Sequence, residues 1–210
     1  MRNLNLKSQA LLNALSLIDK IYKESMYGRN DMFRIQDIID SLSAPQWESK
    51  EILVSALQDV MPLSKSDKIY VIGGWYGLLS ALLAEVTHAE IFSIDIDPFC
   101  EQYGKQIFNG NNFHFKNESL MQIMIEGLED VDVIISTSCE HFEAEELKQL
   151  ITMKPDDTII ALQSNDYVEH SSHINTHPTL DSFINSLDID VIYQNETTFD
   201  MYKRYTVIGK

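Results

Sequence analysis

The chain has 210 residues, of which 44% are hydrophobic and 23% are charged, ordinary globular values that exclude wholesale disorder. Its 32 acidic and 16 basic residues give a formal net charge of -16. This charge disfavours a nucleic-acid partner, because phosphate backbones are bound by basic residues. Two cysteines make no disulfide framework, and no apolar run approaches the roughly 18 residues of a membrane span. We therefore expect a cytoplasmic protein with no membrane partner.

The N-terminal part of the chain predicts helices. Apolar residues recur at helical spacing over 3–27, again from 35 to 42, and again over 47–57. We expect residues 1–60 to form a helical cap on a second domain that spans residues 61–210.

From Lys68 onward the hydrophobic period changes, and short β-branched runs alternate with helical stretches. Such alternation predicts a parallel sheet with helices on both faces, and two final strands without an intervening helix predict an antiparallel pair. The predicted fold class is α/β: a doubly wound, seven-stranded, mostly parallel sheet with a terminal antiparallel strand, plus the N-terminal helical cap. We expect strands at 68–73, 90–95, 112–116, 131–136, 157–163, 189–194 and 202–208, and helices at 77–87, 98–108, 119–127, 143–150 and 179–187.

A glycine turn follows the first of these strands and contains Gly73, Gly74 and Gly77. Its spacing differs from the G-x-G-x-x-G fingerprint of dinucleotide-binding proteins. Asp95 ends the next strand, where an acidic side chain can accept hydrogen bonds from a ribose diol. Because Asp97 is placed to cap the following helix, Asp95 is left for a ligand. The pattern predicts an adenosine-containing cofactor.

This order of glycine turn, acid and closing strand pair resembles the class I S-adenosylmethionine-dependent methyltransferases, over roughly residues 46 to 210. The resemblance implies S-adenosylmethionine as the cofactor. It places the glycines beside the methionine part of that cofactor, Asp95 at the ribose and Ile96 beside the adenine. A polar residue after the third strand would meet the adenine amino group, and Asn117, Glu118 and Ser119 are its candidates. The bulky Trp75 and Tyr76 stand where the family often has small residues. The cofactor-binding residues predicted in this way are Gly73, Gly74, Trp75, Gly77, Asp95, Ile96, Glu118, Ser138 and Trp47.

Trp47 has two interpretations that the sequence leaves open. In this class an aromatic residue entering the first core helix often closes over the cofactor. Trp47 is equally well explained by hydrophobic packing between the helical cap and the core.

A concentrated polar tip follows the fourth predicted strand, from Ser136 to His141. In the methyltransferases the loop after this strand faces the transferred methyl group, and Ser138 would lie beside the cofactor. Glu140 or His141 could take a proton from the acceptor, a role that suits a histidine titrating near neutrality. The Asn-Pro-Pro-aromatic tetrapeptide of enzymes that methylate amino groups of DNA bases or glutamine is absent, which argues against a standard adenine or cytosine amino methyltransferase.

The fifth predicted strand also ends in polar residues, and a histidine-rich loop follows it. His170, His173 and His177 approach the spacing of zinc ligands. Asn175 and Pro178 oppose the helix that this spacing would need. We therefore predict no metal ion, and instead a polar acceptor pocket built from Asn165, His170, His173 and Asn175 beside Glu140 and His141.

The predicted function is methyl transfer from S-adenosylmethionine to a small polar molecule or a protein. One alternative is an aminocarboxypropyl transferase resembling the nicotianamine synthases, which also have a helical cap before such a core. A second alternative, of another class, is a non-catalytic acidic binding protein. The sequence leaves the acceptor and the oligomeric state open.

Overall fold

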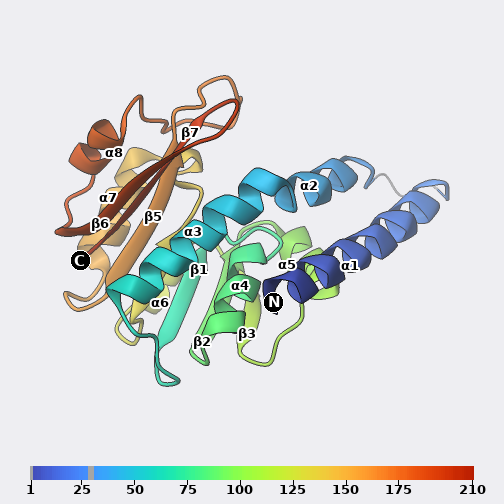
Figure 1. Ribbon diagram of the computed structural model, residues 1–210, viewed down its shortest axis with the longest axis horizontal. Helices are drawn as coiled ribbons and strands as arrows, with labels where there is room; N and C mark the ends of the chain where they lie inside the picture. Colours follow the sequence, from blue (N-terminus) through green and yellow to red (C-terminus); the bar gives the residue numbers. More distant parts are fainter. Residues whose placement is uncertain (1, 28–30) are drawn as a thin grey trace.

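The computed structural model describes residues 2–27 and 31–210, with side chains from residue 5 onward. One sheet lies between two layers of helices (Figure 1). Every predicted strand and helix is present, with ends shifted by a few residues.

The strands are β1 (Lys68–Ile72), β2 (Glu90–Asp95), β3 (Phe113–Asn117), β4 (Val133–Ser136), β5 (Ile159–Asn165), β6 (Val191–Thr198) and β7 (Lys203–Gly209). The helices are α1 (Arg2–Ser25), α2 (Phe33–Ser41), α3 (Ala44–Val60), α4 (Leu78–Val86), α5 (Pro98–Ile107), α6 (Leu120–Glu126), α7 (Ala144–Met153) and α8 (Leu180–Ser186), with a short 3-10 turn η1 (Cys139–His141).

The sheet has the strand order β3-β2-β1-β4-β5-β7-β6. Strands β1 to β5 are parallel, and β7 runs antiparallel to both of its neighbours, β5 and β6. The predicted fold class is thereby confirmed, including the antiparallel last strand. In the register, Ile69 of β1 lies opposite Ile91 of β2 on one side and Val133 of β4 on the other.

The hydrophobic core consists of two clusters, one on each face of the sheet. Strand β4 contributes to both because side chains alternate along a strand: Val133 and Ile135 join the first cluster, and Ile134 joins the second. Helices α4 and α5 cover the first face, and α6, α7 and α8 supply apolar residues to the second. Residues of α1, α2 and α3 belong to the first cluster too, so the N-terminal helices share their core with the sheet.

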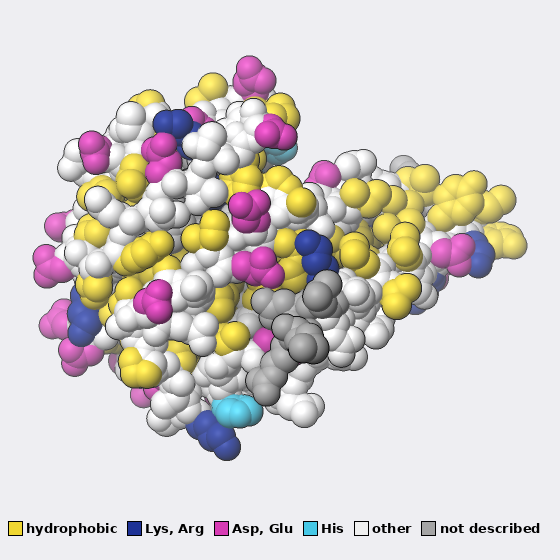
Figure 2. Space-filling view, viewed as in Figure 1, with side chains coloured by type: hydrophobic (Ala, Val, Ile, Leu, Met, Phe, Trp, Pro, Cys, Tyr) yellow, Lys and Arg dark blue, Asp and Glu magenta, His cyan; other side chains and the backbone are white. Residues whose placement is uncertain are grey.

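Parts of α1 and α2 extend beyond the body of the sheet, at the right of Figure 1. Figure 2 shows apolar side chains gathered on this extension. No helix in the described part of the chain is long and apolar enough to cross a membrane. The exposed large apolar side chains of α1 and α2 and of the residues beside them are Leu11, Leu12, Leu15, Tyr22, Met26, Tyr27, Met32, Phe33 and Ile39.

The shared core gives a test of the predicted division into a cap over residues 1–60 and a domain over 61–210. Leu57 of α3 is fully buried, and we expect Leu57→Ala to lower the free energy of unfolding by about 2–5 kcal/mol through the lost contacts and the cavity. Leu12→Ala in α1, where the side chain is 62% exposed, should change it by about 0.5 kcal/mol or less. Chemical denaturation followed by circular dichroism and by tryptophan fluorescence measures both. A separate early transition in Leu57→Ala would mean that the helical cap unfolds independently of the sheet.

Candidate functional site

A cavity of about 790 Å³ opens where the chain leaves the carboxyl ends of β1, β2, β4 and β5. The strand order reverses between β1 and β4, and open α/β sheets hold ligands in the crevice at such a point. Helix α3 and strand β7 contribute further side chains to the wall. The cavity therefore has a glycine-turn end after β1 and β2, and a polar end after β4 and β5.

The glycine turn closes directly against the segment that follows β4. Gly73 has a φ of +65°, and a Cβ atom there would lie 2.5 Å from Oγ of Ser138, so glycine is required on both counts. Trp75 has a φ of +49°, a left-handed conformation that costs a non-glycine residue about 1–3 kcal/mol. Its half-buried ring lines the cavity, whereas Tyr76 is 1% exposed and lies in the core.

Asp95 fixes this turn to the end of β2. One carboxylate oxygen accepts a hydrogen bond from the backbone N–H of Trp75 at 2.9 Å, and the other accepts from the N–H of Asp97 at 3.0 Å. Asp97 in turn caps α5 by accepting from the N–H of Phe99, as the sequence predicted, and pairs with Arg34. The half-buried Asp95 lines the cavity, and a carboxylate has about four lone-pair sites, so Asp95 keeps accepting capacity for a ligand.

Three residues after β2 and β3 form the outer wall of the glycine-turn end: Ile96, Glu118 and Ser119. Asn117 is not part of this wall. Its side-chain amide donates to the backbone carbonyls of Asp95 and Ile96 and so joins the two loops. Of the three candidates for the adenine contact, Glu118 and Ser119 are thus the ones in the cavity wall.

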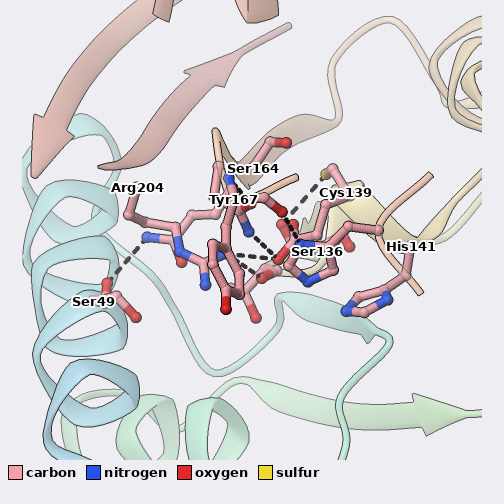
Figure 3. Close-up of polar contacts among 12 residues, drawn as sticks. Ser49, Ser136, Cys139, His141, Ser164, Tyr167 and Arg204 are labelled. Atoms are coloured by element: carbon pink, nitrogen blue, oxygen red, sulfur yellow. Dashed lines mark hydrogen bonds and ion pairs between the residues drawn. The ribbon is translucent and has the colours of Figure 1, made fainter. Parts of the chain in front are cut away.

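The polar end is organised by Glu140, which is 3% exposed. Its Oε1 atom accepts hydrogen bonds from the amide of Asn165 at 2.6 Å and from the guanidinium of Arg204 at 3.1 Å. Arg204 also donates to the backbone carbonyl of Thr137 at 3.2 Å. In Figure 3 Arg204 lies between helix α3, which carries Ser49, and the segment after β4. The cluster joins β7, β5 and the β4 tip through one buried ion pair.

Lys50 of α3 brings a second buried cation to this end of the cavity. Its ammonium group donates to the side-chain oxygen of Gln46, one helical turn earlier. Burial, together with repulsion from Arg204, lowers the pKa of Lys50 to about 7, and the Glu140 carboxylate acts in the opposite direction. With Lys50 protonated, the buried cluster holds two positive groups, Lys50 and Arg204, beside the one carboxylate of Glu140.

Three histidines complete the polar end. The ring centroids of His141 and His173 are 4.8 Å apart, as are those of His170 and His173. Loss of hydration lowers the pKa of His141; Glu140 raises it, and His173 and His170 lower it further. The net shift of the His141 pKa is downward, which favours the neutral imidazole.

The structure brings together most of the site residues predicted from the sequence, but two of them, Trp47 and Gly77, lie outside the cavity wall. Trp47 is 1% exposed and packs in the core, and it does not line the cavity. Gly77 begins α4 with a φ of +90° and lies outside the cavity wall. His177 is buried against Phe183, so it is not part of the histidine cluster. His141 of the preceding loop meets His170 and His173 instead.

Sequence reasoning missed several residues of the cavity wall, namely Lys50, Arg204, Tyr202 and Arg34. Lys50 had a detectable signal, since it follows Gln46 by one helical turn in the segment that carries Trp47. Arg204 had none, because a single arginine in a terminal strand does not reveal a buried carboxylate partner that lies 64 residues away.

A scan against protein-family models and a search of curated proteins both find no match. Solved structures do match. N-methyltransferase NodS from Bradyrhizobium japonicum, in complex with S-adenosyl-L-homocysteine, aligns with a TM-score of 0.63 and 13% identity over 94% of this chain and 97% of that one. Magnesium protoporphyrin IX methyltransferase (ChlM) from Synechocystis, with bound SAH, aligns with a TM-score of 0.62 and 16% identity over 88% of this chain and 90% of that one. A TehB-like SAM-dependent methyltransferase from Corynebacterium glutamicum gives a TM-score of 0.54 at 14% identity, over 80% and 95%.

The chain has the fold of the class I S-adenosylmethionine-dependent methyltransferases. The similarity reaches across the N-terminal helices as well as the sheet, since the NodS alignment covers 94% of the chain. At 12–16% identity it establishes the methyltransferase fold and not an acceptor.

The buried ion pair predicts a large effect of charge removal at Glu140. Glu140→Gln leaves Arg204 buried without an anion, and we expect the free energy of unfolding to fall by about 3–5 kcal/mol. Glu169→Gln, at an exposed position, should change it by about 0.5 kcal/mol or less. Urea denaturation compares the two, and Arg204→Met combined with Glu140→Gln should recover part of the loss. Equal stability of Glu140→Gln and Glu169→Gln would show that the pair does not stabilise the fold.

Lys50 predicts a pH dependence of stability. Below a folded-state pKa of about 7 both the folded and the unfolded state carry the proton, so the full cost of burying the charge is present. As the pH rises towards the ordinary value of 10.5, the folded state releases the proton and this cost is relieved. We expect the stability of the wild type relative to Lys50→Met to rise by up to about 1.4 kcal/mol per pH unit above neutrality. A difference that stays constant from neutral to alkaline pH would contradict the assignment.

Proposed function

We propose that the protein transfers the methyl group of S-adenosylmethionine to a small polar acceptor or to a protein side chain. The observation that carries the proposal is the Gly73–Trp75 turn held by Asp95 at the switch point of a methyltransferase fold. Similar structures were solved with bound SAM or SAH, among them ChlM and NodS.

In this proposal the cofactor lies across the glycine-turn end of the cavity. Backbone at Gly73 and Gly74 approaches its methionine part, and the free lone pairs of Asp95 accept from its ribose hydroxyls. Ile96 lies beside the adenine, with Glu118 or Ser119 near the adenine amino group. Support comes from the cavity, which all of these residues line and which suits a ligand of this size.

The acceptor then occupies the polar end, near Ser138. Methyl transfer is a displacement in which the enzyme positions the acceptor and removes its proton. Glu140 or His141 receives that proton, and Asn165, His170 and His173 orient the acceptor. The lowered pKa of His141 and its exposed position support a role as base, whereas Arg204 and Asn165 both donate to Oε1 of Glu140.

Asp95 gives the direct test of this proposal. Asp95→Asn keeps one oxygen for the turn but loses the charge-assisted bonds to the ribose, which are worth about 1.5–3 kcal/mol. We expect S-adenosylmethionine to bind the wild type in calorimetry and Asp95→Asn to bind it about 10- to 150-fold more weakly. Asp156→Asn, at an exposed position before β5, is the matched control and should bind it normally. Absence of binding to the wild type, or unchanged affinity in Asp95→Asn, would overturn the proposal.

The nature of the transferred group is tested by the product. With acceptor present, methyl transfer releases S-adenosylhomocysteine, whereas aminocarboxypropyl transfer releases methylthioadenosine. Chromatography of the cofactor after incubation with candidate small-molecule acceptors distinguishes them, and we expect S-adenosylhomocysteine.

A further inference from the structure

The side chains of Glu140, His141 and His173 converge at the polar end of the cavity. One potential ligand atom from each of them lies within 4.8 Å of the other two. His170 stands beside them, with its ring centroid 4.8 Å from that of His173 and 6.3 Å from that of His141. The residues come from η1 and from the loop after β5, two segments that the parallel sheet brings to one edge.

Hydrogen bonds to backbone carbonyls fix the tautomers of two of these imidazoles. Nδ1 of His173 lies 2.6 Å from the carbonyl oxygen of Tyr167, and Nδ1 of His141 lies 3.1 Å from that of Ser172. A carbonyl can only accept, so each Nδ1 carries the proton and each Nε2 keeps its lone pair. A backbone carbonyl on the second nitrogen is the usual outer partner of a metal-binding histidine.

His170 is held differently. Its Nδ1 faces the backbone N–H and the hydroxyl of Ser172, the hydroxyl at 2.8 Å. This nitrogen accepts from the N–H, so the proton belongs on Nε2. His170 is therefore placed to support the cluster and not to ligate an ion.

Glu140 is the negatively charged side chain of the cluster. Asn165 and Arg204 occupy its Oε1, which fixes the orientation of the carboxylate. Its Oε2 is buried and has no hydrogen-bond partner among residues 2–27 and 31–210. A buried carboxylate oxygen is costly without a partner, and the lone pairs of His141 and His173 cannot donate to it. A cation satisfies all three groups at once.

We infer that Glu140, His141 and His173 form a binding site for one divalent first-row transition-metal ion such as Zn²⁺. Two imidazoles and a carboxylate suit Zn²⁺ or Fe²⁺, whereas Mg²⁺ prefers oxygen ligands. Ligands of a tetrahedral zinc ion lie roughly 3.3 Å apart, so the three side chains close by about 1.5 Å or less when the ion binds. His141 is exposed and His173 is partly exposed, which leaves room for that movement, and both side chains line the cavity.

The role of this ion rests on the proposed function, although the site itself does not. An ion here would bind an oxygen or nitrogen atom of the acceptor and lower its pKa, so that a water molecule could take up the proton. In the metal-bound protein Glu140 and His141 are then ligands and do not act as the base, and the acceptor is a molecule that can coordinate a metal.

Direct metal binding tests the site without cofactor or acceptor. Calorimetry of the untagged, chelator-treated full chain with Zn²⁺ should give one ion per chain with micromolar or tighter affinity. His173→Ala should weaken it at least about 10- to 100-fold, and His170→Ala should weaken it less. His88→Ala, at an exposed position between α4 and β2, is the matched control and should bind as the wild type does. Co²⁺ should give visible absorption bands of a nitrogen-ligated ion in the wild type and in His88→Ala, and lose them in His173→Ala.

Three results would overturn the inference: no Zn²⁺ binding by the wild type, equal affinities in His173→Ala and His88→Ala, or displacement of Zn²⁺ by equimolar Mg²⁺. Thermal melts of each variant establish that it is folded. Because S-adenosylmethionine is absent from these titrations, failure of the metal site and failure of the proposed function are observed in separate experiments.

Discussion

The reversal of strand order between β1 and β4 is the constraint on which the site depends. Strands β1, β2, β4 and β5 are parallel, so their carboxyl ends meet at one edge, and helices leave this edge towards opposite faces of the sheet. A crevice must open between those helices. The turn at Gly73 and the tip at Ser138 lie on its two sides and touch, since a methyl group at Gly73 would collide with the Ser138 hydroxyl.

Two carboxylates hold the ends of this crevice in different ways. Asp95 accepts from two backbone N–H groups and lies half-buried, so it orders the glycine turn and still faces a ligand. Glu140 is buried, and Arg204 and Asn165 bind one of its oxygens. The first arrangement suits a neutral diol, and the second needs a cation or a proton at its remaining oxygen. The two ends of the cavity thereby differ in the burial and the hydrogen bonding of their carboxylates.

The histidine loop shows where reasoning from spacing ends. His170, His173 and His177 are close in sequence. Their spacing suits zinc ligands only if they lie on a helix, and the sequence disfavours a helix there. In the fold, His177 packs on Phe183, and His141 approaches the other two from the loop after β4. No helix spans residues 170–177, but a group of side chains that includes His141 from the loop after β4 does not need one.

The sequence by itself determined the elements and the parallel sheet with its antiparallel last strand, and it predicted Asp95 and the Ser136–His141 tip as site residues. These follow from local patterns, since hydrophobic period and turn residues act over a few positions. Only the tertiary structure decided that Trp47 belongs to the core, and that Lys50 and Arg204 reach the cavity. It alone also decided which ring nitrogen of His141 and of His173 faces a backbone carbonyl. Those properties depend on which distant segments pack together, and no short-range pattern encodes such a contact.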